Sequence, residues 1–145
     1  IHVAAETTGY ASPARFAAFM EHIDLFLFDF KHADREAHFA GTGVYNDVIL
    51  ENLQQLVRAG RPVIARIPVI PRFNSSPASA KAMAARLREL GVHEVHLLPF
   101  HQFGQNKYTQ LGIPYEMAQY KQLHPEVLTN YRQIFLDEGL DCTFR

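Results

Sequence analysis

The sequence predicts a small α/β fold, either an open parallel sheet or a piece of a β/α barrel. Short apolar runs alternate with segments of helical period along the chain. Each apolar run ends in polar residues and a turn, and the units recur at a spacing of roughly 22–40 residues. A complete eight-fold barrel needs about 250 residues, whereas this chain has 145. We therefore expect about four strand–helix units and a terminal strand within one domain over residues 1–145.

Five segments are expected to be strands because each is a short apolar run bounded by turn residues. They cover residues 2–5, 23–30, 63–69, 95–98 and 140–144. The second run is almost wholly apolar, which is typical of a parallel strand covered on both faces. Pro71 ends the third run and Pro99 the fourth, because proline cannot donate to a ladder of hydrogen bonds.

Four segments are expected to be helices, over residues 13–22, 46–60, 77–90 and 125–138. The first and third begin at Ser-Pro pairs, in which serine is the N-cap and proline the first helical residue. The second has one apolar face, and Gly60 ends it. The residues expected to point inward on the last helix are Val127, Leu128, Tyr131, Ile134 and Phe135. Residues 101–116 are expected to form a long loop.

The composition is that of an ordinary globular domain, with 48% hydrophobic residues, 20% charged residues and a net charge of −1. No basic stripe indicates nucleic-acid binding, and no apolar run approaches the about 18 residues of a membrane span. The single cysteine, Cys142, excludes an internal disulfide and favours a reducing cytoplasm. No signal peptide is visible. The chain begins at Ile1, in what looks like the middle of a strand, so we expect it to be cut from a longer sequence.

Charged and polar side chains follow the expected strands, where parallel α/β folds gather their functional groups. Glu6 follows the first strand, Asp29 and Lys31 flank the end of the second, Arg66 lies within the third, and His101 follows the fourth. Asp29 and Lys31 are two residues apart, so both side chains leave the same face of the strand. We expect these groups to converge on one rim.

Two interpretations stay open for each of these groups. Asp29 and Lys31 either form a mutual ion pair or bind a zwitterion, with Lys31 facing a carboxylate and Asp29 an amine or a cation. Arg66 either pairs with Asp29 or Glu6, or faces an anionic ligand group. His101 either caps and packs the strand end or belongs to the site.

Other kinds of site find little support. A zinc set of His32, His38, His96 and His101 lacks the short fixed spacing of zinc sites. There is no glycine-rich phosphate loop, and no serine or cysteine nucleophile lies in a strand–turn–helix elbow.

Four ordered motifs together resemble the glycyl radical enzyme activating enzymes, of which pyruvate formate-lyase activating enzyme is the best known. The motifs are Glu6-Thr7-Thr8-Gly9-Tyr10; Asp29-Phe30-Lys31-His32 with His38, Thr42-Gly43-Val44 and Asn46; Arg66-Ile67-Pro68-Val69-Ile70-Pro71 with Asn74; and Leu97-Leu98-Pro99-Phe100-His101 with Phe103-Gly104, Asn106-Lys107-Tyr108 and Leu111-Gly112. The resemblance covers essentially the whole chain.

The resemblance implies the C-terminal half of a radical S-adenosylmethionine (SAM) (β/α)6 barrel. In this family a [4Fe–4S] cluster and SAM generate a 5′-deoxyadenosyl radical, which takes a hydrogen atom from a glycine of the partner enzyme. The implied partners are a glycyl radical enzyme such as pyruvate formate-lyase and a flavodoxin- or ferredoxin-type reductant, in anaerobic metabolism.

The resemblance also implies residue roles. By position, the SAM contacts are Asp29, Lys31, Arg66 and His101; the monovalent-cation site beside SAM is Glu6, Thr7 and Asp29; and the substrate-facing residues are Arg66, Lys107 and Tyr108. No catalytic residue and no cluster ligand is expected in this chain, which lacks the CxxxCxxC motif and the Gly-Gly-Glu segment. Glu6 also stands where the family commonly has aspartate, and Arg72 where it has glycine.

The sequence therefore favours part of a radical SAM activase that is inactive by itself. Two alternatives remain. One is another α/β-barrel enzyme, such as a metal-dependent hydrolase that uses Asp29, Lys31 and His101. The other is a non-catalytic module that binds SAM or a protein partner.

Overall fold

The computed structural model describes all residues from 1 to 145 and contains one five-stranded sheet. Its strands run in the order β1-β2-β3-β4-β5, and every neighbouring pair is parallel. They are β1 (Ala4–Thr7), β2 (Leu25–Asp29), β3 (Val63–Val69), β4 (Glu94–Pro99) and β5 (Asp141–Phe144). The predicted α/β class and parallel sheet are confirmed.

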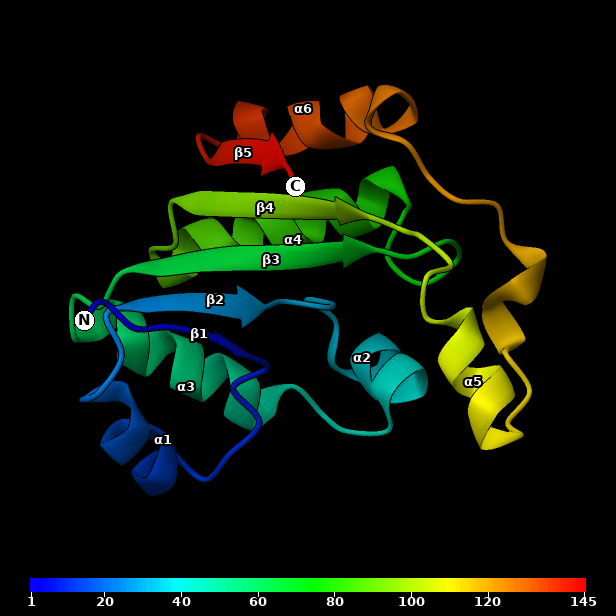
Figure 1. The fold of residues 1–145 in the computed structure, drawn as a ribbon. Coiled ribbons are helices and arrows are strands. Elements are labelled where there is room, and N and C mark those ends of the chain that lie inside the picture. Colours follow the sequence, from blue (N-terminus) through cyan, green and yellow to red (C-terminus); the bar gives the residue numbers. More distant parts are fainter.

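Six helices connect or follow the strands (Figure 1). They are α1 (Pro13–Met20), α2 (Arg35–Thr42), α3 (Asp47–Arg58), α4 (Pro77–Leu90), α5 (Gln105–Leu111) and α6 (Thr129–Asp137). Two 3-10 turns, η1 (Glu116–Gln119) and η2 (Pro125–Leu128), lie between α5 and α6. Figure 1 shows α2 and α5 beyond the arrowheads of the strands, at the carboxyl edge of the sheet. No helix has the combination of length and apolar character needed to cross a membrane.

The core lies between the sheet and the helices packed on one of its faces. Alternate residues of β2, among them Phe26 and Phe28, are fully buried. Phe16 of α1 packs against both rings, at centroid distances of 6.1 and 6.4 Å. The buried seams of α3 and α4 add Ile49, Leu53, Leu56, Met83, Leu87 and Leu90. These faces follow the helical period read from the sequence.

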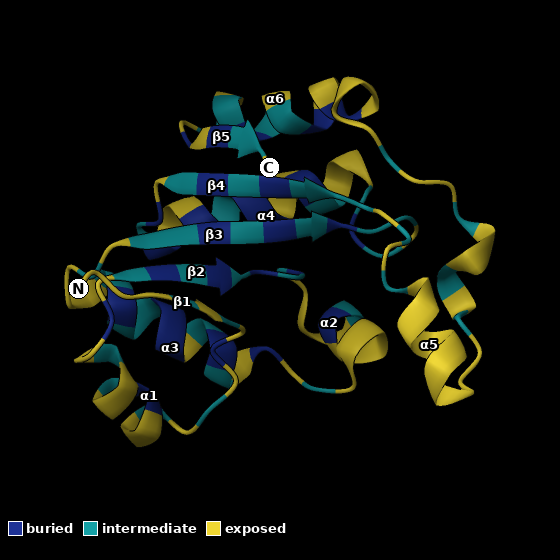
Figure 2. Ribbon diagram, in the orientation of Figure 1, coloured by how far each residue is buried: buried dark blue, intermediate teal, exposed yellow.

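The second face of the sheet is half-exposed and partly polar, as the alternating blue and teal of the strands shows (Figure 2). Leu25 and Leu27 are only half-buried. The expectation that both faces of this strand are covered is therefore wrong for this chain. Polar pairs lie along this face: His96 and Glu94 of β4 approach within 3.1 Å, and His96 is in register with Arg66.

Two helices lie in segments where no helix was expected. The segment before residue 46 forms α2, and the segment 101–116 contains α5. Neither has an apolar seam, because His38 is the only buried residue of α2 and α5 buries none. The last helix also differs, since η2 precedes α6 and leaves Val127 70% exposed. A tighter 3-10 turn moves that side chain off the face expected for a continuous α-helix.

The turn after β3 contains Arg72, the only residue other than glycine with a positive φ, at 62°. This left-handed conformation favours glycine, because a Cβ atom crowds the backbone there. Arg72 thus has a backbone conformation that favours glycine, at a position where the resemblance led us to expect glycine. Its guanidinium lies 5.8 Å from the ring centroid of Tyr120, within cation–π range.

Candidate functional site

The end of β2 presents an ion pair at the carboxyl edge of the sheet. Lys31 Nζ donates a hydrogen bond to Asp29 Oδ2 at 3.2 Å, and Phe30 between them is buried. The side chains therefore share one face, as the spacing predicted. They stay 27% and 30% exposed, so solvent reaches both charges. The mutual ion pair is the arrangement observed, and it leaves two ammonium hydrogens of Lys31 for other acceptors.

A cavity of about 410 Å³ opens beside this ion pair. Its walls come from the turn after β1, the end of β2, α2 and the start of α3. The lining residues are Thr8, Tyr10, Asp29, Lys31, His38, Thr42, Val44 and Ile49. The volume falls within the range of small-molecule sites, and the lining combines apolar surface with a few polar groups.

Glu6 and Arg66 form a second ion pair next to this cavity, with Arg66 Nη1 2.5 Å from Glu6 Oε1. Arg66 is in register with Asp29 on the adjacent strand, and its side chain is 20% exposed. Of the alternatives left open by the sequence, pairing of Arg66 with Glu6 is the one observed. Neither residue lines the cavity itself.

The other expected site residues lie further from the cavity. Thr7 accepts a hydrogen bond from Gly9 N–H at 3.0 Å, and it is Thr8 that reaches the cavity. His101 is exposed and packs on Phe103, with ring centroids 4.4 Å apart. Lys107 and Tyr108 are exposed on α5 at the same edge of the sheet. Nowhere in residues 1–145 do three or more His, Cys, Asp or Glu side chains gather as metal ligands would.

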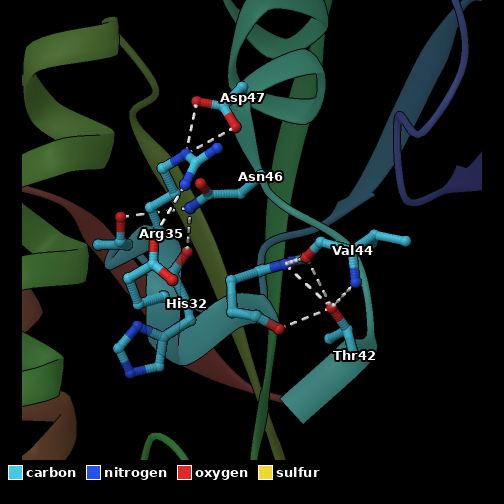
Figure 3. A network of polar contacts seen from close by, with 9 residues as sticks. His32, Arg35, Thr42, Val44, Asn46 and Asp47 are labelled. Atoms are coloured by element: carbon cyan, nitrogen blue, oxygen red, sulfur yellow. Dashed lines mark hydrogen bonds and ion pairs between the residues drawn. The ribbon is translucent and has the colours of Figure 1, made fainter. Parts of the chain in front are cut away.

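The segment from β2 to α3 is held by polar contacts that the sequence reading did not foresee (Figure 3). Asn46, 3% exposed, donates to the carbonyl oxygens of His32 and Ala33 at 3.1 and 3.3 Å. At the exposed side Arg35 donates to both oxygens of Asp47, at 3.2 and 3.0 Å. These contacts fix α2 as one wall of the cavity.

His38 and Thr42 of α2 are cavity residues that the sequence reading missed, although both lie in the quoted motifs. Thr42 donates its hydroxyl to the carbonyl oxygen of His38 at 2.7 Å. Their placement depends on a helix without an apolar seam. The available signal was the set of polar residues between 32 and 42, directly after a buried strand: His32, Asp34, Arg35, Glu36, His38 and Thr42.

Asn74 links the ends of β2 and β3 and is fully buried. Its amide donates to the carbonyl oxygens of Lys31 at 2.9 Å and Pro68 at 2.8 Å. Its Oδ1 accepts from Ile70 N–H at 2.7 Å. Asn74 thus sets the backbone position from which Lys31 reaches the cavity.

His32 is a buried histidine in the connection between β2 and α2. Its Nδ1 accepts from Asp34 N–H at 3.0 Å, so Nε2 carries the hydrogen and donates to Ser79 Oγ at 3.2 Å. Burial lowers the pKa of His32 below its ordinary value of 6.5, and this effect outweighs the opposing attraction of Asp34. Protonation would also remove the lone pair that accepts from Asp34 N–H.

We expect this histidine to make stability pH-dependent. Because the unfolded chain binds the proton more readily, the contribution of His32 is present above about pH 6.5 and is lost as the pH falls. His32→Asn keeps an acceptor near the Nδ1 position but does not titrate. Urea unfolding between about pH 7.5 and 5.5 should therefore show a shallower loss of stability in the variant. Equal slopes for the two proteins would contradict this role.

Known proteins resemble this chain over nearly its whole length. A 4-hydroxyphenylacetate decarboxylase activating enzyme of Clostridium scatologenes is 38% identical over 145 residues, which cover 98% of this chain and 46% of that protein. An isethionate sulfite-lyase activating enzyme of Nitratidesulfovibrio vulgaris is 47% identical over 111 residues, covering 74% of this chain and 36% of that protein. The chain thus spans less than half the length of these relatives. No family model matches it.

Solved structures give the same result for the fold. A domain of pyruvate-formate lyase-activating enzyme from Bacteroides vulgatus aligns with a TM-score of 0.79 and 28% identity, over 100% of this chain and 81% of that one. A radical SAM methyltransferase from Sphaerobacter thermophilus aligns with a TM-score of 0.69 over 98% of this chain and 39% of that one, at 18% identity. The second likeness concerns the fold alone.

Proposed function

Because this chain belongs to the glycyl radical enzyme activating enzymes, we propose that it forms the C-terminal portion of a radical SAM activase and supplies one wall of its SAM site. The observation that carries the proposal is the cavity at the carboxyl edge of the sheet, with Asp29 and Lys31 as its charged pair.

The residues of the cavity suit SAM. The methionine part of SAM is a zwitterion, and the cavity offers one cation and one anion 3.2 Å apart, both open to solvent. Lys31 can donate to the ligand carboxylate while Asp29 keeps the Lys31 ammonium group in place. A charge-assisted hydrogen bond of this kind contributes about 1.5–3 kcal/mol. Val44 and Ile49 add the apolar surface that a nucleoside requires.

The residues of this chain do not suit a [4Fe–4S] cluster. Such a cluster needs three cysteine thiolates, and Cys142 is the only cysteine, fully buried on β5. Burial raises the pKa of its thiol to about 12, which disfavours the thiolate. In our proposal the cluster ligands lie elsewhere in the full-length protein.

The remaining residues have supporting roles in the proposal. Glu6, Thr7 and Asp29 would hold a monovalent cation beside SAM. His101 and Arg66, which do not line the cavity itself, would contact SAM from outside it. Arg66, Lys107 and Tyr108 face the partner polypeptide at the same edge. When bound, SAM would supply the radical chemistry that takes a hydrogen atom from a partner glycine, with the electron coming from the cluster. The residues of this chain would orient SAM.

The proposed partner is a glycyl radical enzyme. Relatives that cover 98% of the chain are named as activators of 4-hydroxyphenylacetate decarboxylase, which makes that enzyme the first partner to test. The full-length protein should be loaded anaerobically with iron and sulfide, then given SAM, a flavodoxin- or ferredoxin-type reductant and the partner. We expect a glycyl radical signal in electron paramagnetic resonance that requires SAM. Absence of SAM cleavage by the loaded protein would contradict the proposal.

A further inference from the structure

His38 is a buried histidine whose contacts within the protein use only one of its two ring nitrogens. It is 3% exposed, and it lines the cavity together with Asp29 and Lys31. Its Nδ1 lies 2.8 Å from the carbonyl oxygen of Val44 and 3.0 Å from Thr42 Oγ1. One ring nitrogen is therefore fully used within the protein.

These contacts fix the tautomer of the neutral ring. A carbonyl oxygen only accepts, so Nδ1 carries the hydrogen and donates it to Val44. Nε2 is then an unprotonated acceptor. It has no hydrogen-bond or ion-pair partner among residues 1–145.

Nε2 is also open to solvent. The buried side-chain polar atoms that lack a partner are Asn52 Oδ1, Arg61 Nε and Thr143 Oγ1, and His38 Nε2 is not among them. Because the residue is almost wholly buried, the small opening to Nε2 is the cavity that the ring lines. The only space from which a partner can reach Nε2 is therefore the cavity, and a polar atom there is expected to bind water or a ligand group.

We propose that His38 is a ligand-binding residue, whose Nε2 accepts a hydrogen bond from an N–H or O–H donor of the molecule in this cavity. This inference rests on the proposed function, in which the ligand is SAM. The donor is then the amino group of the methionine part or a hydroxyl of the ribose. His38 would thereby add an acceptor to a site whose other polar wall, Asp29 and Lys31, is already an ion pair.

The test uses two substitutions that separate the two ring nitrogens. His38→Asn keeps a donor near the Nδ1 position for the Val44 carbonyl but has no atom near Nε2. His38→Gln places an amide near Nε2. Calorimetry with SAM on the full-length protein should show binding about three- to ten-fold weaker for His38→Asn, with partial recovery in His38→Gln. His93→Asn, an exposed histidine at the opposite edge of the sheet, is the matched control and should bind like the unaltered protein.

A second ligand identifies the donor. If 5′-methylthioadenosine, which lacks the amino-acid part, also loses affinity in His38→Asn, the contact is to the nucleoside. A loss confined to SAM assigns it to the amino group. Unchanged SAM affinity in a folded His38→Asn protein overturns the proposal while the SAM site stands. If the unaltered protein does not bind SAM, the proposed function fails and this contact with it.

Nitrogen-15 chemical shifts of the His38 ring give a readout that does not depend on SAM. In the neutral ring of the unliganded protein, Nδ1 should carry the hydrogen and Nε2 should be bare. A hydrogen on Nε2 with a bare Nδ1 would contradict the hydrogen-bond assignment from which the proposal follows.

Discussion

Replacing Asn74 with alanine is expected to lower the free energy of unfolding by on the order of 3 kcal/mol or more, the largest effect on stability that we expect from a polar side chain here. The side chain is fully buried and makes three hydrogen bonds to backbone groups. Its removal leaves the carbonyl groups of Lys31 and Pro68 and the N–H group of Ile70 without that partner. Each buried donor or acceptor left without a hydrogen bond costs about 1–3 kcal/mol.

The matched control is Asn130→Ala, at an exposed position on α6, which should change the stability by less than about 0.5 kcal/mol. Urea unfolding of both variants measures the difference. SAM binding to Asn74→Ala, measured without urea while the variant is folded, should also be weaker. The Lys31 carbonyl group loses its hydrogen bond from Asn74, so the backbone of Lys31 is held less firmly. A stability equal to that of the control would show that the Asn74 hydrogen bonds do not hold the strand ends together.

The second large effect is expected on ligand binding. Lys31→Met keeps the length of the side chain and removes its charge, so the ammonium no longer reaches the SAM carboxylate. A charge-assisted hydrogen bond corresponds to roughly ten- to a hundred-fold in affinity. The free energy of unfolding should change little, because the ion pair with Asp29 is partly exposed and such pairs contribute about 0–1 kcal/mol.

Lys81→Met, on the exposed side of α4, is the control for the loss of one positive charge. Its SAM affinity should match that of the unaltered protein. Lys31→Arg should recover part of the binding, because it restores a cation at a different geometry. If calorimetry finds Lys31→Met and Lys81→Met equally tight, Lys31 does not belong to the SAM site.

The sheet could be predicted from the sequence because the residue patterns that mark each strand are local. Each strand is an apolar run between turn signals, and the buried positions of α3 and α4 follow a simple period. Local spacing also predicted that Asp29 and Lys31 lie together, because residues two apart on a strand have side chains on the same face. The observed ion pair follows from that spacing.

The remaining features depend on long-range contacts. Pairing of Glu6 with Arg66 depends on which strands are neighbours and in what register. Helix α2 has no apolar seam and is positioned by Asn46 and by the buried His38, so periodicity could not reveal it. For the same reason the cavity lining from α2 was missed, and α5 was taken for a loop.

The central claim is that SAM binds in the cavity at the carboxyl edge of the sheet. The most direct test is a nuclear magnetic resonance titration of the isotope-labelled full-length protein with SAM. We expect shift changes concentrated at Thr8, Lys31 and Val44, which line that cavity. The cavity of about 430 Å³ at the opposite edge, lined by Val57 and His93 among others, is the internal control and should not respond. Shift changes concentrated at that opposite edge, or none at saturating SAM, would contradict the account.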